Sequence, residues 1–429
     1  MRSSAASDVY KRQEEEHGSV RLPRSAVGKG RQEADEANKP AEVEAIEAFL
    51  LSQAEFRHNV ITHHCEIRWT EEAGFLPLTD RDVNTLWGRM NKTVGRVYLT
   101  DIYNVIHSEF VPLFNPFQSY FDHLPSWDGV SDPIGDLADT VHVKSDQAEF
   151  RDYFRKWFVG ILPALLDDTV VNHEILVLIG EQGLYKTTWF NFLLPPELRC
   201  YFYTKTNSDR LNKDDLFSLT EFALICFEEL DGMRPAELNQ LKAMVTMPYV
   251  NERAAYGRNK ERHPHIASFC GTGNNVQFLT DPTGNRRWLP FEVSQIRDPH
   301  LHAIPYELVY SQAYALWKSG FCHWFSQEEI RKLNMHNSRF EVPNLEEDLI
   351  RTHFRKPFEG EAGIFVTAAD ILEQISSCLR YPLSPNKIGR IMAGLEFESI
   401  RYKGKRGYIT VKKTGEDIDR ERRSGALGL

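Results

Sequence analysis

Residues 180–189 read GEQGLYKTTW and follow the apolar run EILVLI at 174–179. The apolar run has the length of a short buried strand, and KTTWFNFLL at 186–194 repeats apolar residues at helical spacing. A strand, a glycine-containing turn and a helix, in this order, form the frame of a phosphate-binding loop. The stretch therefore predicts an α/β domain with a phosphate site at the start of the helix.

The loop departs from the usual phosphate-binding pattern at one position. That pattern has a glycine directly before the lysine, and this sequence has Tyr185 there. A side chain at this position crowds the backbone near a nucleotide, because glycine allows close approach without steric cost. Lys186 is expected at the β- and γ-phosphates, and the Thr187 hydroxyl is expected on Mg²⁺. The predicted nucleotide-binding residues are Gly180, Gln182, Gly183, Tyr185, Lys186, Thr187 and Thr188.

Two acidic residues end a second predicted strand, in FALICFEELDGM at 222–233. Carboxylates delivered by a strand next to a phosphate loop can help to hold Mg²⁺ and activate water. We expect Glu228 in the outer shell of the metal, which makes Thr187 and Glu228 the predicted metal-site residues. We expect Glu229 to orient or deprotonate the attacking water. Without the loop, the same pattern would be read as an ordinary surface turn.

A third predicted strand and a turn supply the other candidate catalytic residues. IASFCGTGNN at 266–275 ends in polar residues, and Asn274 is expected to polarise the attacking water. LTDPTGNRRWLPFEV at 279–293 places Arg286 and Arg287 in a turn. Guanidinium groups stabilise the charge on a transferring phosphoryl group, and a neighbouring subunit can supply them. The alternative is a pair of surface arginines.

These motifs together resemble a known family. The set GEQGLYKTTW, ICFEELD, LKAMVTMPYVNERAAYGR, ASFCGTGNN and DPTGNRRWLPF is similar to the virulence-associated E family of phage and mobile-element proteins, over roughly residues 100–320. That family is related to superfamily 3 helicases. The resemblance implies a P-loop ATPase core of the AAA+ kind that uses ATP and Mg²⁺. It assigns Lys186 and Thr187 to the first motif, Glu228 and Glu229 to the second, and Asn274 to the sensor.

A basic interval at 235–265 separates the acids from the third strand. In superfamily 3 helicases this interval holds a hairpin that tracks DNA in the channel of a ring, and the similarity implies the same use here. Arginine and lysine with an interleaved tyrosine suit phosphate contact and base stacking. The alternative is a solvated basic loop. The candidate DNA-binding residues are Arg253, Tyr256, Arg258, Lys260 and Arg262.

The C-terminal region predicts a winged-helix-like domain. Two helical patterns, at 366–376 and 384–395, precede two alternating strands within 397–413. Such a domain can place its second helix in a major groove and its wing on phosphates, although winged helices also dock proteins. Residues 381–413 hold eight Lys or Arg and two Asp or Glu. The candidate DNA contacts are Lys387 and Arg390 on the helix and Lys403, Lys405 and Arg406 on the wing.

Composition limits the class of protein. The net charge of −10 means that DNA contacts must come from local basic patches. Six scattered cysteines without a C-x-x-C pair fit a reducing cytoplasm, and no apolar run is long enough to span a membrane.

The sequence predicts six divisions of the chain. They are a disordered leader 1–45 whose residues 1–13 resemble sequencing-adapter read-through, a mostly helical region 46–170, the ATPase core 171–325, a linker helix region 326–360, the winged-helix-like domain 361–415 and a tail 416–429.

The sequence therefore predicts an ATP-dependent, helicase-like DNA replication protein of a phage, plasmid or integrated mobile element. Expected partners are DNA, mainly single-stranded, a separate primase or replication initiator, and further copies of the chain in a homo-oligomeric ring, with a hexamer favoured. Two alternatives stay open. One is a nucleotide-binding switch in which Tyr185 has removed turnover, and the other is a structural DNA-binding protein whose nucleotide holds an oligomer together.

Overall fold

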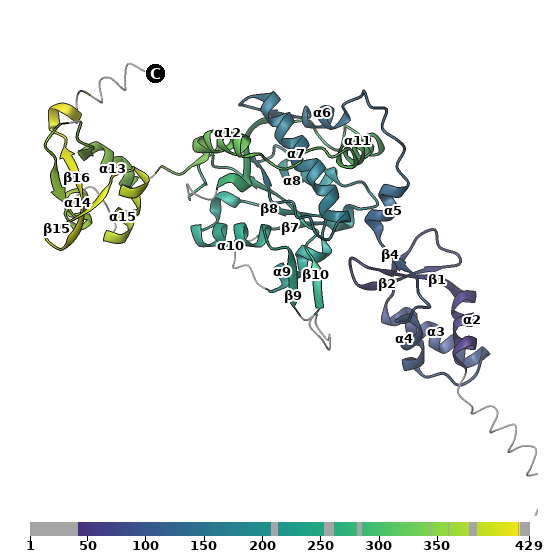
Figure 1. Cartoon of the computed structure of the whole chain (residues 1–429). Coiled ribbons are helices and arrows are strands. Elements are labelled where there is room, and N and C mark those ends of the chain that lie inside the picture. Colours follow the sequence, from purple (N-terminus) through teal and green to yellow (C-terminus); the bar gives the residue numbers. More distant parts are fainter. Residues whose placement is uncertain are drawn as a thin grey trace, which may run out of the picture. The chain divides into compact units, whose positions relative to one another are not determined.

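The computed structural model describes residues 42–206, 213–252, 261–280, 285–343, 345–358, 360–376, 384–418 and 420. The chain divides into two compact units, Met1–Leu124 and Pro125–Leu429, and has a mixed α/β fold (Figure 1). No helix within the described ranges is long and apolar enough to cross a membrane.

The first unit packs helices against one face of a small sheet. In chain order its elements are α2 (Val43–Gln53), β1 (Ala54–Asn59), β2 (His64–Trp69), β3 (Leu76–Pro77), α3 (Asp80–Thr93), α4 (Leu99–Ile106), β4 (Leu113–Phe114) and α5 (Pro116–Asp122). The strand order is β3-β2-β1-β4, with β1 and β2 antiparallel. Apolar residues of the helices, such as Leu86, share a core with Phe56 and Ile67 of the sheet.

The β1–β2 hairpin adds strands to a region that was expected to be mostly helical. Its loop contains neither glycine nor proline, so the turn signal is weak. The Asn59 side chain closes the turn instead, because its Oδ1 accepts hydrogen bonds from the backbone N–H groups of Ile61 and Thr62 at 3.0 and 3.2 Å. This local side-chain bond takes the place of the usual turn residues.

The second unit is built on a six-stranded sheet. Its elements up to residue 340 are α6 (Pro133–Ala138), β5 (Val141–Val143), α7 (Gln147–Leu166), β6 (Ile175–Ile179), α8 (Lys186–Leu193), η1 (Arg199–Tyr201), β7 (Phe202–Lys205), α9 (Lys213–Glu221), β8 (Leu224–Phe227), η2 (Leu230–Gly232), α10 (Pro235–Val245), β9 (Tyr249–Glu252), β10 (Glu261–Pro264), β11 (Ser268–Gly273), η3 (Asn285–Arg287), β12 (Trp288–Ile296), α11 (Tyr306–Lys318), α12 (Gln327–Asn337) and η4 (Ser338–Phe340).

The sheet order is β5-β12-β6-β11-β8-β7. All neighbouring strands are parallel except β5, which runs antiparallel to β12. Every residue of β6, β8 and β11 is buried, which places these strands inside the sheet. β6 and β8 are continuously apolar, whereas β11 includes Ser268 and Thr272. The strands expected within 174–179, 222–233 and 266–275 are therefore present, as β6, β8 and β11.

Helix α7 packs against this sheet. Its Trp157 side chain is fully buried and donates from Nε1 to the carbonyl oxygen of Phe269 in β11, at 3.0 Å. The sequence analysis placed this helix in a separate N-terminal region that ended at residue 170. Contacts of this kind join it to the sheet instead, because its apolar face is wide enough to cover the central strands.

The remaining described elements form a C-terminal part with its own apolar core. They are α13 (Leu345–His353), β13 (Phe354–Arg355), β14 (Ile364–Val366), α14 (Ala368–Ser376), α15 (Pro385–Gly394), β15 (Ser399–Tyr402) and β16 (Lys405–Lys412). The two helices and the hairpin expected from the sequence are present. Ile350 and Phe354, from a stretch expected to be a linker, contribute to this core beside Ile371, Ile388 and Tyr408.

Candidate functional site

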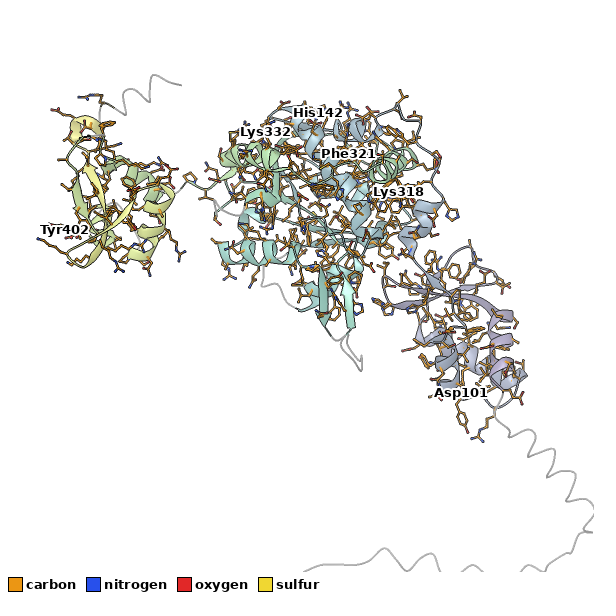
Figure 2. The ribbon with its side chains drawn as sticks, in the orientation of Figure 1. Asp101, His142, Lys318, Phe321, Lys332 and Tyr402 are labelled. Atoms are coloured by element: carbon orange, nitrogen blue, oxygen red, sulfur yellow. The ribbon has the colours of Figure 1, made fainter. Side chains whose placement is uncertain are left out.

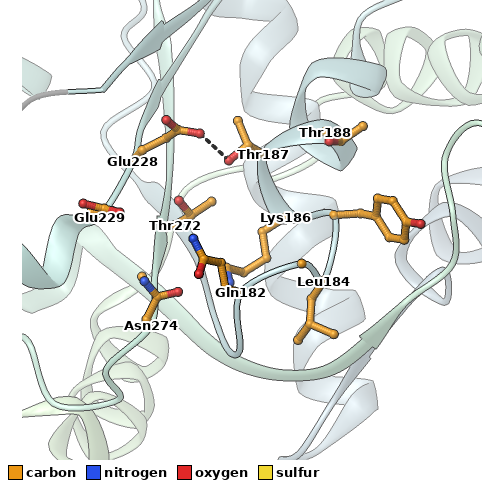
Figure 3. Close-up of a pocket in the computed structure, with 12 residues that line it drawn as sticks. Gln182, Leu184, Lys186, Thr187, Thr188, Glu228, Glu229, Thr272 and Asn274 are labelled. Carbon is orange, nitrogen blue, oxygen red and sulfur yellow. Dashed lines mark hydrogen bonds between the residues drawn. The ribbon is translucent and has the colours of Figure 1, made fainter.

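Three adjacent strands end at one cleft of about 400 Å³ at the carboxyl edge of the parallel sheet. Ligands of open α/β sheets bind at this edge, because the loops that follow the strands converge there. The loop after β6, the acids after β8 and the end of β11 surround the cleft (Figure 3). Its lining residues are Gln182, Gly183, Leu184, Tyr185, Lys186, Thr187, Thr188, Glu228, Glu229, Thr272, Gly273 and Asn274.

Lys186 begins helix α8 and extends back under the loop. Its Nζ donates to the carbonyl oxygens of Gly180 and Glu181, at 2.7 and 2.8 Å. Burial lowers the pKa of Lys186, while the charge of Asp231 acts in the opposite direction. The N-terminus of a helix attracts anions, because its backbone N–H groups are free to bind them and the helix dipole is positive there. The ammonium group of Lys186 adds a positive charge at the same place.

Tyr185 adopts the left-handed backbone conformation, with φ 60° and ψ 17°. This region favours glycine and costs other residues about 1–2 kcal/mol. The position thus keeps the backbone geometry for which glycine is the usual residue. The Tyr185 side chain is 42% exposed, so it is not packed into the interior. Gly183 also has a positive φ, of 88°.

Thr187 and Glu228 meet across the cleft. The Thr187 hydroxyl donates to Oε1 of Glu228 at 2.8 Å, as the dashed line in Figure 3 marks. Glu229, the next residue, is also in the left-handed conformation, with φ 54°. It lies on the same side of the cleft as Asn274 in Figure 3. The cleft thus brings together the lysine, the hydroxyl, both acids and the sensor asparagine named from the sequence.

Asp231 is a site residue that the sequence analysis did not single out. Its carboxylate accepts hydrogen bonds from the backbone N–H groups of Asn274 and Asn275, at 3.2 and 3.1 Å, and from Nδ2 of Asn275 at 2.7 Å. Gly273 permits this approach, because a Cβ there would lie 3.2 Å from the Asp231 carboxylate. Asp231 therefore fixes the Asn274 loop relative to Glu228 and Glu229. The sequence feature that could have identified it is a third acidic residue, separated from the pair Glu228 and Glu229 by one leucine.

Arg286 and Arg287 lie at the opposite edge of the sheet. They precede β12, whose first residue, Trp288, pairs with Ile175 at the start of β6, whereas the loop follows the last residue of β6. At about 3.3 Å per strand residue, this separates the arginines from the loop by roughly 15–20 Å. The structure therefore does not bring these two side chains to the cleft of their own chain.

The turn that carries the arginines is held firmly. Asn337 donates from Nδ2 to the carbonyl oxygens of Asn285 and Trp288, at 2.8 and 3.0 Å. Arg286 is exposed and Arg287 is half-buried. Burial and the charge of Arg286 lower the pKa of Arg287, and its buried Nε has no hydrogen-bond partner in the described part of the chain.

Comparison with known protein families identifies the family of this chain. The model of the virulence-associated protein E-like domain matches residues 122–342, just over half of the chain. The chain belongs to the virulence-associated protein E-like family. The family resemblance drawn from the motifs is thereby confirmed. No curated protein matches the chain.

Solved structures of one region of another protein are similar to this chain at low identity. The apo structure of the NrS-1 C-terminal region (305–718) is 12% identical, covers 86% of this chain and 98% of its own, and has a TM-score of 0.45. An A-form apo structure of the same region is 13% identical with a TM-score of 0.43, again over 86% of this chain and 98% of its own. Similarity at this level does not identify a function.

The candidate DNA-binding residues of the family core fall partly outside the described residues. Arg253, Tyr256, Arg258 and Lys260 lie there, between β9 and β10. The two strands form an antiparallel pair, so the interval does contain a hairpin stem. On the stem, the Arg262 guanidinium lies 3.5 Å from the centre of the Tyr249 ring, a cation–π contact.

The other candidate DNA-binding residues lie beyond the virulence-associated protein E-like match, in the C-terminal part. Lys387 on α15 forms an ion pair with Glu346 of α13. Arg390 on the same helix is exposed. Lys403, Lys405 and Arg406 are exposed on the β15–β16 hairpin. The hairpin therefore presents more exposed basic side chains than the helix does.

Proposed function

We propose that this family member is an ATP-dependent, helicase-like DNA replication protein of a phage, plasmid or integrated mobile element. The observation that supports this most strongly is the cleft itself. Lys186 and Thr187 begin the helix after a buried strand, and Glu228 and Glu229 end a nearby parallel strand. This is the arrangement in which P-loop proteins hold a nucleoside triphosphate and activate water.

The chain's residues would divide the work of ATP hydrolysis as follows. The loop backbone and the Lys186 ammonium bind the β- and γ-phosphates, in place of the present contacts of Lys186 with Gly180 and Glu181. Glu229 orients the attacking water and accepts its proton. Asn274, held by Asp231, keeps that water in line with the phosphoryl group.

The oxygen atoms of Thr187 and Glu228 fit a Mg²⁺ site. The Thr187 hydroxyl would bind the ion, and Glu228, which accepts a hydrogen bond from that hydroxyl at 2.8 Å, would lie in its outer shell; Mg²⁺ prefers oxygen ligands of this kind. Among the described residues no group of three or more His, Cys, Asp or Glu could hold a metal ion without further ligands. Such an ion would therefore depend on ATP phosphates and water, and it would neutralise charge on the γ-phosphate.

The position of the arginine turn favours a shared site. Because Arg286 and Arg287 lie at the far edge of their own sheet, they could stabilise the transferring phosphoryl group only in another subunit. A head-to-tail ring, for which we favour a hexamer, places the far edge of one subunit at the cleft of the next. The β9–β10 hairpin and the C-terminal part would then contact DNA, and a separate chain would supply priming.

Hydrolysis of ATP by the purified full chain, with and without single-stranded DNA, tests this proposal. We expect Mg²⁺-dependent turnover that single-stranded DNA stimulates, together with displacement of a labelled strand from a forked duplex. Lys186→Ala serves as the inactive control. Tight ATP binding without turnover would instead support a nucleotide-dependent switch. This is the second candidate function, and the observation that favours it is Tyr185, a non-glycine residue with φ 60° in the loop.

A further inference from the structure

The C-terminal sheet has an exposed face that is both aromatic and basic. Ile400 pairs with Gly407, Tyr402 pairs with Lys405, and Phe365 pairs with Ile409. Directly paired residues of antiparallel strands point to the same face. We call the face formed by Phe365, Ile400, Tyr402, Lys405, Gly407 and Ile409 the outer face.

The opposite face of this sheet belongs to the core. Val366 and Tyr408 pair with each other there and are 8% and 5% exposed. They pack with Ile371 of α14 and Ile388 of α15. The helices therefore cover one face of the sheet only. The aromatic side chains of the outer face do not belong to this core, so core packing does not account for their presence.

The two aromatic rings of the outer face come from strands β14 and β15 and lie together. The ring centres of Phe365 and Tyr402 are 5.4 Å apart. Gly407 makes room for Phe365, because a Cβ at this position would lie 2.5 Å from its ring. Tyr402 is 53% exposed and projects outward in Figure 2. An exposed ring such as that of Tyr402, next to the half-buried ring of Phe365, can stack on the bases of a nucleic acid.

The hairpin places positive charge beside Tyr402. Lys405 pairs with Tyr402 on the outer face, whereas Arg401 and Arg406 pair with each other and point to the opposite face near the exposed end of the hairpin. Lys403 occupies the turn with φ 49°, in a position that favours asparagine or glycine. Residues 399–413 contain no Asp or Glu, and their basic residues are Arg401, Lys403, Lys405, Arg406, Lys412 and Lys413.

We propose that the outer face binds single-stranded nucleic acid, with unpaired bases stacked on Tyr402 beside Phe365 and phosphates on Lys405 of this face and Lys403 of the adjacent turn. Double-stranded DNA fits less well, because its bases are already stacked on each other and cannot stack on the rings. Only its phosphates would contact this face. The inference rests on the DNA-binding part of the proposed function. It shifts the main contact from helix α15, where Lys387 is paired with Glu346, to the sheet.

Crosslinking locates the contact directly. The full chain without nucleotide is irradiated with a single-stranded oligonucleotide that carries 5-iododeoxyuridine, and the crosslinked peptides are identified by mass spectrometry. We expect peptides that contain Tyr402 or Phe365. Crosslinks confined to other parts of the chain would overturn the proposal.

Fluorescence anisotropy then measures the role of the ring. Tyr402→Ala should weaken binding of labelled oligo(dT) about tenfold, because stacking contributes about that factor per base. Tyr402→Phe should bind like the wild type. Phe358→Ala is the matched control, since Phe358 is an exposed aromatic residue of the same part but lies outside the paired strands.

A duplex of the same length separates stacking from charge. We expect Tyr402→Ala to leave duplex binding unchanged, whereas an equal loss on both DNAs would contradict base stacking. If the wild type bound no DNA at low salt, the outer face would instead fit an acidic protein, and the proposal would fail. Both measurements omit ATP, so a chain that binds DNA through Tyr402 yet hydrolyses no ATP would refute the proposed function and leave this inference standing.

Discussion

At the carboxyl edge of the parallel sheet, Lys186, Thr187 and Glu228 surround one cleft, whereas Arg286 and Arg287 lie on the turn at the amino edge. The first group follows β6 and β8 and, in our proposal, binds the triphosphate, whereas the second precedes β12 and would stabilise the transferring phosphoryl group. Because β12 is parallel to β6, the two groups lie at opposite ends of these strands, and no side-chain rotation can bring them together. The difference teaches that an ATP site that used both groups would need a second copy of the chain.

The largest effect is expected at the carboxyl edge. Lys186→Ala removes the buried ammonium that the loop encloses, so ATP binding and hydrolysis should both be lost. Equilibrium binding of a fluorescent ATP analogue and phosphate release measure the two separately. Lys332→Ala, which removes an exposed lysine of α12 that does not line the cleft, is the control. Hydrolysis at the wild-type rate by Lys186→Ala would show that the loop is not the phosphate site.

Glu229→Gln should separate binding from turnover. The amide keeps the size of the side chain and its ability to hydrogen-bond, but it cannot take up a proton from water. We therefore expect ATP·Mg²⁺ to bind with near-normal affinity while turnover falls below detection. If Glu229→Gln lost ATP·Mg²⁺ binding and turnover to the same degree, Glu229 would be a metal ligand, and Glu228 would be the residue that accepts the proton of the attacking water.

Asp231→Asn should give an intermediate effect. The charged acceptor holds two backbone N–H groups of the Asn274 loop, and hydrogen bonds to a charged group contribute about 1.5–3 kcal/mol. We expect kcat to fall roughly tenfold to a hundredfold while KM for ATP changes little. A normal kcat would show that Asp231 does not position Asn274. Glu237→Gln, at a helix start outside the cleft, is the matched control.

The smallest effect is expected at Tyr185. Glycine relieves the left-handed strain but gains entropy in the unfolded chain, so Tyr185→Gly should change the free energy of unfolding by less than about 1 kcal/mol. ATP affinity should stay close to that of the wild type. A β-branched residue tolerates this conformation poorly, so Tyr185→Val should destabilise the loop and weaken ATP binding. Thermal unfolding measures the stability of the two variants, and nucleotide titration measures their ATP affinity. If Tyr185→Gly and Tyr185→Val had the same stability and affinity, the left-handed backbone conformation at residue 185 would not matter for ATP binding.

Local patterns were enough to predict the elements around the cleft. Lys186 and Thr187 follow a buried strand, and Glu228 directly follows another, so the length and apolar character of these runs were enough to predict the strands. Strand order is not local, however, and only the pairing of Trp288 with Ile175 shows that the arginine turn lies far from the loop. The contact of Asp231 with Asn275 likewise depends on two strands meeting in space.

The most direct test of a site divided between two edges uses two inactive proteins. One carries Arg286→Ala and Arg287→Ala with an intact Lys186, and the other carries Lys186→Ala with both arginines intact. In a head-to-tail assembly, some interfaces of the mixture pair a working loop with working arginines. Since such an arginine contributes on the order of 10³-fold in rate, the mixture should hydrolyse ATP measurably faster than either component with DNA present. A mixture no more active than its components, together with a monomeric mass in ATP and DNA, would contradict the account.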